Sequence, residues 1–175
     1  MFAINGEVGL LHATKSNRPL SPLEFFFIGG ENSIRGMRFR SVTVRDANGI
    51  AVLDQFGAGV GGDKFMQYNV EYHFLTGGPF RVLLFADAGN VYGEVPRVLG
   101  AFVSCTTTLN GTPPPKGACV DQGFSFNHLR YTAGVELRVL IPLFGAPLRF
   151  IYSKNLRPLP LDEFETFQFS IGTSF

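Results

Sequence analysis

The chain has 175 residues, with 15 Lys and Arg against 14 Asp and Glu. This near balance gives no electrostatic reason to expect a nucleic acid or a strongly acidic partner. Only 17% of the residues are charged, against about 25% in ordinary soluble domains, and no run approaches the roughly 18 apolar residues of a membrane-spanning helix. With 19 Phe and 21 Gly, the composition favours a β-structure with an apolar outer face over a helical membrane protein.

Alternating apolar and polar side chains predict six strands along the chain. In one of them Tyr68 and Tyr72 share a face, while Asn69 and Glu71 share the other. At this length a tilted strand crosses the hydrocarbon layer of a membrane. In chain order, the strands are expected at 2–14, 65–75, 81–91, 129–141, 148–155 and 166–175.

The alternation has two explanations. A soluble antiparallel sheet with one face on a core alternates in the same way as a membrane barrel. Here the apolar faces carry large aromatic side chains, and the opposite faces carry charged and amide side chains along most of their length. A water-filled lumen permits such polar faces, so the pattern favours a transmembrane barrel over a soluble β-sandwich.

The connections between the strands alternate between short and long. Tight Gly/Pro turns are expected at 76–79 and 142–146, whereas long loops are expected at about 15–64 and 92–128. Outer-membrane barrels have short periplasmic turns and long extracellular loops. The order of turns therefore places the C-terminal residue, Phe175, on the periplasmic side.

Six strands are too few for a closed single-chain barrel, which has at least eight. Unpaired strand edges in lipid cost several kcal/mol for each polar group. The first residues have no basic region followed by a long apolar stretch, so they do not form a signal peptide. We therefore expect an all-β fold: residues 1–175 as one segment of a transmembrane antiparallel β-barrel that is larger than this chain, or that pairs its edges with other copies.

Four sequence signatures follow one another at 27–37, 85–91, 133–152 and 167–175. The first contains Ile34-Arg35-Gly36-Met37, with Met37 where an aromatic residue is usual, and the second reads Phe-Ala-Asp-Ala-Gly-Asn-Val. Together they resemble the last third of the barrel in outer-membrane assembly factors of the BamA/TamA type, the bacterial surface antigen family. The resemblance implies a barrel of about 16 strands, of which this chain holds about six.

The resemblance also implies that the first long loop folds into the lumen and sets its arginine, Arg35, against acidic residues of the wall. The matching acids are Glu71 and Asp87, and both lie on the face that the alternation assigns to the lumen. A planar guanidinium suits this task because it can bind carboxylates in bidentate fashion, and Gly36 allows a tight tip. The alternative is a solvated arginine on a mobile loop.

The terminal strand, with Phe167, Phe169 and Phe175, resembles the signal by which outer-membrane proteins are recognised for insertion. The resemblance implies that in the assembly factors this strand pairs weakly with the first strand of the whole barrel. This weak pairing leaves a lateral gate, where client strands add by edge pairing. Gly172 matches the position where the strand can bend inward.

The remaining residues offer little chemistry. Cys105 and Cys119 lie in the second long loop, and their even count in an exported chain favours a disulfide. No metal site is expected there, and His12, His73 and His128 lack ligand spacing. Since no nucleophile–base pair is evident either, we expect neither an enzyme nor a cofactor.

The expected function is assembly and insertion of β-barrel proteins into the bacterial outer membrane. The expected partners are outer-membrane lipids, unfolded outer-membrane protein clients, and accessory lipoproteins that bind through periplasmic domains outside this chain. One alternative is a related secretion or autotransporter-assembly barrel, which shares the same signatures. Another is a passive porin or adhesin-type barrel, which should lack the constellation of Arg35 with Glu71 and Asp87.

Overall fold

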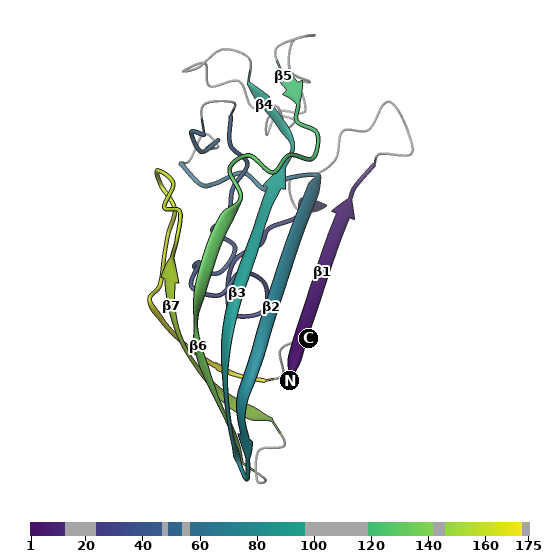
Figure 1. Cartoon of the computed structure of the whole chain (residues 1–175). Helices are drawn as coiled ribbons and strands as arrows, with labels where there is room; N and C mark the ends of the chain where they lie inside the picture. The colour runs from purple at the N-terminus through teal and green to yellow at the C-terminus, as the bar shows by residue number, and fades with distance from the viewer. Residues whose placement is uncertain (13–23, 47–48, 54–56, 97–118, 142–145, 173–175) are drawn as a thin grey trace.

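The structure, a computed structural model, describes residues 1–12, 24–46, 49–53, 57–96, 119–141 and 146–172. Its main feature is a six-stranded antiparallel sheet in the order β1-β2-β3-β6-β7-β8 (Figure 1). The strands are β1 (Phe2–Leu10), β2 (Lys64–Gly77), β3 (Phe80–Tyr92), β6 (Arg130–Leu140), β7 (Pro147–Asn155) and β8 (Phe167–Ile171). All six expected strands are therefore present, in an uninterrupted antiparallel order.

The bounds of some elements differ from those the alternation predicts. Strand β2 is longer than expected, with a register shift between His73 and Leu75, and β8 is shorter, with five residues. The second long loop contains two unexpected strands, β4 (Glu94–Pro96) and β5 (Cys119–Asp121), which pair with each other. Strands of three residues are too short to show a periodic pattern, so the sequence gives no sign of them.

The register of the sheet aligns side chains that point to the same face in rows across neighbouring strands. One row runs across the outer face, and every member is exposed: Phe2, Tyr72, Leu84, Val135, Tyr152 and Phe167. The next row points to the inner face, and every member is buried: His73, Leu83, Glu136, Ile151 and Gln168. Because successive side chains of a strand point to opposite faces, one register determines both rows.

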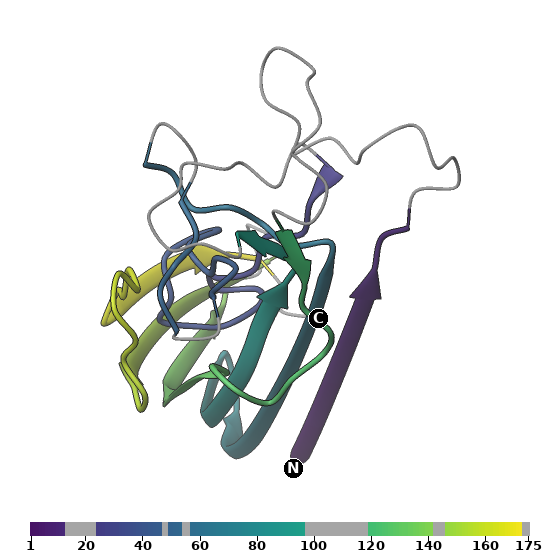
Figure 2. The same cartoon turned by 90° about the horizontal axis from the view of Figure 1, so that it is seen from above.

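The sheet is curved, and the first long loop lies on its concave side (Figure 2). The loop folds on itself through isolated bridges, among them Phe26 with Gly62 and Ile28 with Val42. A buried apolar cluster joins the loop to β3. Val91 of β3 belongs to it, and Phe65 and Phe164 pack against it. The loop supplies its other members: Ile28, Ile34, Met37, Val42 and Val44. The main core thus lies between the loop and the inner wall of the sheet.

Strands β1 and β8 form the two edges of this sheet, which does not close on itself. The β2–β3 turn lies at one end of the sheet, and the β4–β5 pair lies at the other (Figure 1). In the described part of the chain, no helix has the length and apolar character needed to span a membrane.

A substitution in the outer row tests whether this face of the sheet contacts lipid or water. We predict that Leu84→Arg lowers the unfolding free energy of the full-length protein in lipid vesicles by about 2–4 kcal/mol, because a cation on the lipid face of a barrel wall is poorly solvated. Denaturant titration of the vesicle-bound protein measures the loss. Leu84→Met serves as the control, since it keeps an apolar side chain of similar size. Equal stability of the two variants would show that the face meets water.

Candidate functional site

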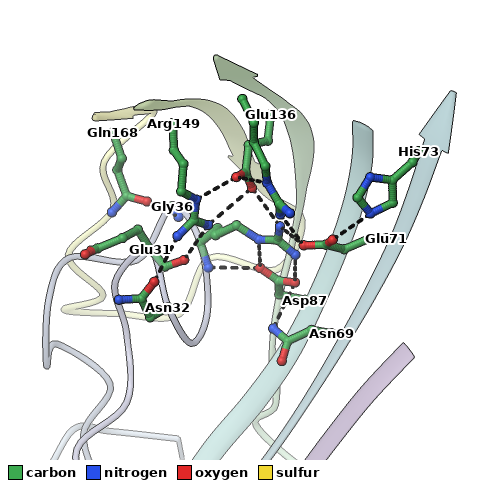
Figure 3. A network of polar contacts seen from close by, with 12 residues as sticks. Glu31, Asn32, Gly36, Asn69, Glu71, His73, Asp87, Glu136, Arg149 and Gln168 are labelled. Atoms are coloured by element: carbon green, nitrogen blue, oxygen red, sulfur yellow. Dashed lines mark hydrogen bonds and ion pairs between the residues drawn. The ribbon is translucent and has the colours of Figure 1, made fainter. Parts of the chain in front are cut away.

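The tip of the inward loop, Ile34 to Met37, buries the guanidinium of Arg35. Figure 3 shows the side chains of Glu71 and Asp87 projecting from the sheet into the polar cluster at this tip. Arg35 Nη1 lies 2.7 Å from Glu71 Oε1, while its Nη2 and Nε lie 2.7 Å and 2.8 Å from the two carboxylate oxygens of Asp87. The backbone N–H of Arg35 also donates to Asp87 Oδ2, at 3.0 Å. The structure thus brings together the three residues that the sequence singled out, with Asp87 held in bidentate fashion.

A third carboxylate, which the sequence reading did not assign to the site, comes from β6. Glu136 Oε2 accepts from Arg35 Nη1 at 2.9 Å. Its other oxygen, Oε1, accepts from Arg138 Nε at 2.7 Å and from Arg149 Nε at 2.6 Å. In the alternation of residues 129–141, Glu136 falls on the polar face with Arg130 and Arg138, but the pattern gives no sign of how far along the lumen this residue lies.

The charges of this cluster balance. Three guanidiniums, of Arg35, Arg138 and Arg149, pair with three carboxylates, of Glu71, Asp87 and Glu136. Arg35, Glu71, Arg138 and Glu136 form a closed ring, which Arg138 Nη2 completes on Glu71 Oε1 at 2.8 Å, while Asp87 joins it through Arg35 and Arg149 joins it through Glu136. Buried charges are tolerated when they are paired and hydrogen-bonded. We call these six residues the lumen network. Counted over these six side chains, the formal charges cancel only when the loop supplies Arg35; outside the six, His73 Nε2 lies 3.0 Å from Glu71 Oε2.

Arginine rather than lysine suits the tip for two reasons. Its donors reach three carboxylates at once, which a point-like ammonium cannot do with the same geometry. Its plane also lies over the ring of Phe85, with Cζ 4.0 Å from the ring centroid. Burial by itself lowers the pKa of Arg35, but its hydrogen bonds and charge interactions with Asp87 and Glu136 outweigh burial and raise that pKa above its ordinary value.

Gly36 is required at the tip by both its backbone and its surroundings. Its φ is +87°, in the left-handed region that favours glycine. A Cβ at this position would lie 2.7 Å from the ring of Phe164 and would also collide with the side chain of Ser153 on β7. The tip therefore lies directly against the wall.

Side chains of the wall also bind the loop just before its tip, at two backbone carbonyls and one side chain. Arg149 of β7 donates from Nη2 to the carbonyl of Glu31 at 3.0 Å and from Nη1 to Asn32 Oδ1 at 2.9 Å. From β2, Asn69 Nδ2 donates to the carbonyl of Ser33 at 2.6 Å. Strands β7 and β2, which lie on either side of β3 and β6, thus both donate hydrogen bonds to the loop.

A second buried cluster fastens another part of the loop. Asp162, in the β7–β8 connection, accepts from Arg45 of the loop at 2.6 Å and from Arg130 of β6 at 3.3 Å. Arg130 also donates to Asn90 of β3 and to the carbonyl of Thr43. The sequence reading missed this cluster because Asp162 lies in an irregular connection.

Comparison with known proteins decides the family. The model of the Omp85 superfamily domain matches residues 1–175. The chain belongs to the Omp85 superfamily. It is 30% identical to "Outer membrane protein assembly factor BamA" of Neisseria meningitidis serogroup B, over 193 residues that take in 98% of this chain and 21% of that protein. The chain thus spans about one fifth of the length of this curated relative.

A solved structure shows the same fold. BamA from Haemophilus ducreyi lacking POTRA domains 1-3 superposes with a TM-score of 0.62 at 20% sequence identity, covering 96% of this chain and 30% of that one. The six-stranded sheet therefore corresponds to part of an Omp85 barrel wall, and membership of the superfamily locates the chain in the outer membrane.

The other residues that the sequence singled out are more dispersed in this Omp85 chain. Phe167 and Phe169 lie exposed on the outer face of β8, and Gly172 follows the strand with a φ of +148°. Phe175 lies outside the described residues. Cys119 in β5 is disulfide-bonded, whereas Cys105 lies outside the described residues. Within the described ranges, no three His, Cys, Asp or Glu side chains are grouped to hold a metal ion.

We predict that Arg35→Ala frees the loop while leaving most strands paired, because three buried carboxylates then face only two guanidiniums. Breaking a buried pair in this way costs about 3–5 kcal/mol. Limited proteolysis of the full-length protein in vesicles should show cleavage within residues 24–63. The matched control is Arg38→Ala, since Arg38 is an exposed residue of the same loop that pairs with Glu163. Wild-type resistance of Arg35→Ala would contradict the role of the network.

The tip glycine allows a sharper comparison. Gly36→Ala should destabilise loop docking strongly, because the added methyl group meets both a strained φ and the wall. Gly57→Ala has a similar φ of +79° but no atom within 4 Å of the added carbon, so it should cost only about 1 kcal/mol of backbone strain. The same proteolysis measures both variants. Equal effects would show that strain alone, and not contact with β7, makes the glycine necessary.

Proposed function

We propose that this chain acts in the assembly and insertion of β-barrel proteins into the outer membrane, as the C-terminal part of an assembly factor. The observation that carries the proposal is the match of nearly the whole chain to a relative named as an outer membrane protein assembly factor. The lumen network around Arg35 agrees with it, because the loop motif and the wall acids together form the constellation expected for such factors.

The proposed mechanism uses strand edges. A free edge presents unpaired N–H and C=O groups, and an incoming strand satisfies these groups by pairing with them. Strand β8 offers such an edge, and its five residues hold it to β7 through a short ladder. A short ladder is easier to separate than the long ladder between β2 and β3. A client strand would pair at this seam in place of water or lipid.

The proposed partners follow from this mechanism. They are unfolded outer-membrane proteins as clients, lipids of the outer membrane against the exposed aromatic row, and accessory lipoproteins that bind through periplasmic domains outside this chain. The activity requires no cofactor, nucleotide or covalent step, because backbone pairing and the transfer of apolar side chains into lipid are themselves favourable.

One structural feature argues against the rival of a passive porin. The inward loop occupies the concave side of the sheet, where a porin needs an open aqueous path (Figure 2). Its apolar residues are buried against the wall, so the loop is packed against the inner face of this part of the barrel. A related secretion barrel would share this feature, and transport of a soluble client would indicate that rival.

The test uses the full-length protein in lipid vesicles and a small barrel client that has been unfolded in urea. We expect the protein to accelerate folding of the client relative to empty vesicles, and Arg35→Ala to remove most of the acceleration because the loop no longer holds the wall in register. The shift in gel mobility between folded and unfolded client measures the rate. Arg38→Ala should match the wild type.

Two results would count against the proposal. Client folding that is no faster than in empty vesicles would remove the assembly activity. A steady open conductance of the wild-type protein in planar bilayers would support a passive pore instead.

A further inference from the structure

The tip of the inward loop pairs with the segment that leads into the terminal strand. Arg38 N donates to the carbonyl of Glu163 at 2.9 Å, and Glu165 N donates to the carbonyl of Gly36 at 2.7 Å. Between them, Met37 and Phe164 form an antiparallel bridge. The chain that enters β8 is therefore bound to the loop as well as to the sheet.

Gln168 extends this contact into β8 itself. Its side chain is buried on the inner face and reaches the loop tip (Figure 3). Its Oε1 accepts from the backbone N–H of Gly36 at 2.8 Å, and its Nε2 donates to the carbonyl of Met37 at 3.0 Å. A primary amide suits this position because it carries an acceptor and a donor side by side, so one side chain satisfies two backbone groups of the tip.

This contact exists in only one register of the terminal strand. Gln168 lies opposite Ile151 of β7. A slip of one residue would turn Gln168 to the outer face, because side chains alternate. A slip of two residues would keep the face but move the amide by about 6.6 Å along the strand, beyond reach of the tip. The docked loop is therefore compatible with one pairing of β8.

We propose that Gln168 is a positioning residue that couples docking of the loop to pairing of the terminal strand. By linkage, docking of the loop raises the equilibrium constant for pairing of β8 by the same factor by which pairing of β8 raises the constant for docking. The consequence for clients rests on the proposed function: the edge at β8 would become available to a client strand only when the loop tip releases Gln168. The lumen network would thus act on the seam through the loop tip, with the amide of Gln168 as the contact inside β8 itself.

The experiment measures hydrogen exchange in the full-length protein in vesicles, for peptides covering 31–38 and 167–171. In Gln168→Met, which keeps the length of the side chain and removes both hydrogen bonds, we expect exchange in both segments to rise about tenfold. Gln168→Glu is the second variant, because its carboxylate would face the carbonyl of Met37 and the carboxylate of Glu165, 3.4 Å from the present Nε2. It should raise exchange in the same two segments.

The control and the reciprocal arm separate coupling from local damage. Ser170→Ala lies on the same face of β8 and should leave the loop segment unchanged. Arg35→Ala should raise exchange in 167–171, although Arg35 does not touch that strand among the contacts of the described residues. In the double variant, Gln168→Met should add little to Arg35→Ala, because the tip is already released.

The coupling is overturned if Gln168→Met and Gln168→Glu alter exchange only in 167–171, or if the two substitutions of the double variant add independently. This readout does not depend on client folding. Loss of coupling with intact client insertion would remove this inference alone, whereas coupled exchange in a protein that inserts no client would remove the proposed function alone.

Discussion

The structure depends on one electrostatic constraint: the guanidinium of Arg35 is buried among three carboxylates that come from three different strands. Without the loop, Glu71 and Glu136 would still pair with Arg138 and Arg149, but Asp87 would keep only the amide of Asn69 among its described contacts and would have no cation beside it. A buried unpaired charge is far costlier than a paired one. The loop therefore has one favourable position, and that position also brings its apolar residues onto the inner wall.

The same constraint also determines which face of each strand carries polar side chains and which carries apolar ones. Because the side-chain period of a strand is two, the register that points Glu71, Asp87 and Glu136 inward also points Tyr72, Leu84 and Val135 outward. An error of one residue in β2, β3 or β6 would expose a carboxylate to lipid and remove it from Arg35. Pairing of the backbone, contact of the apolar outer row with lipid and closure of the lumen network thus select a single register together.

The sequence predicts the parts of the fold that rest on local periodicity. It locates all six long strands and, through the family resemblance, the contact of Arg35 with Glu71 and Asp87. It does not predict the parts that depend on height along the lumen: alternation places Glu136 on the inner face, but not at the level of the loop tip. Asp162 and Gln168 were missed as loop contacts for a related reason, since their partners are more than 100 residues away in the chain.

The contacts of the loop are also distributed unequally between the two edges of the sheet. Residues 31–37 have polar contacts with β2, β3, β6, β7 and β8, whereas among the described residues the tip has none with β1. Strand β1 is held in the sheet by its pairing with β2. These contacts of residues 31–37 therefore fix five strands relative to the loop, and the register of β1 relative to the loop follows through its ladder with β2.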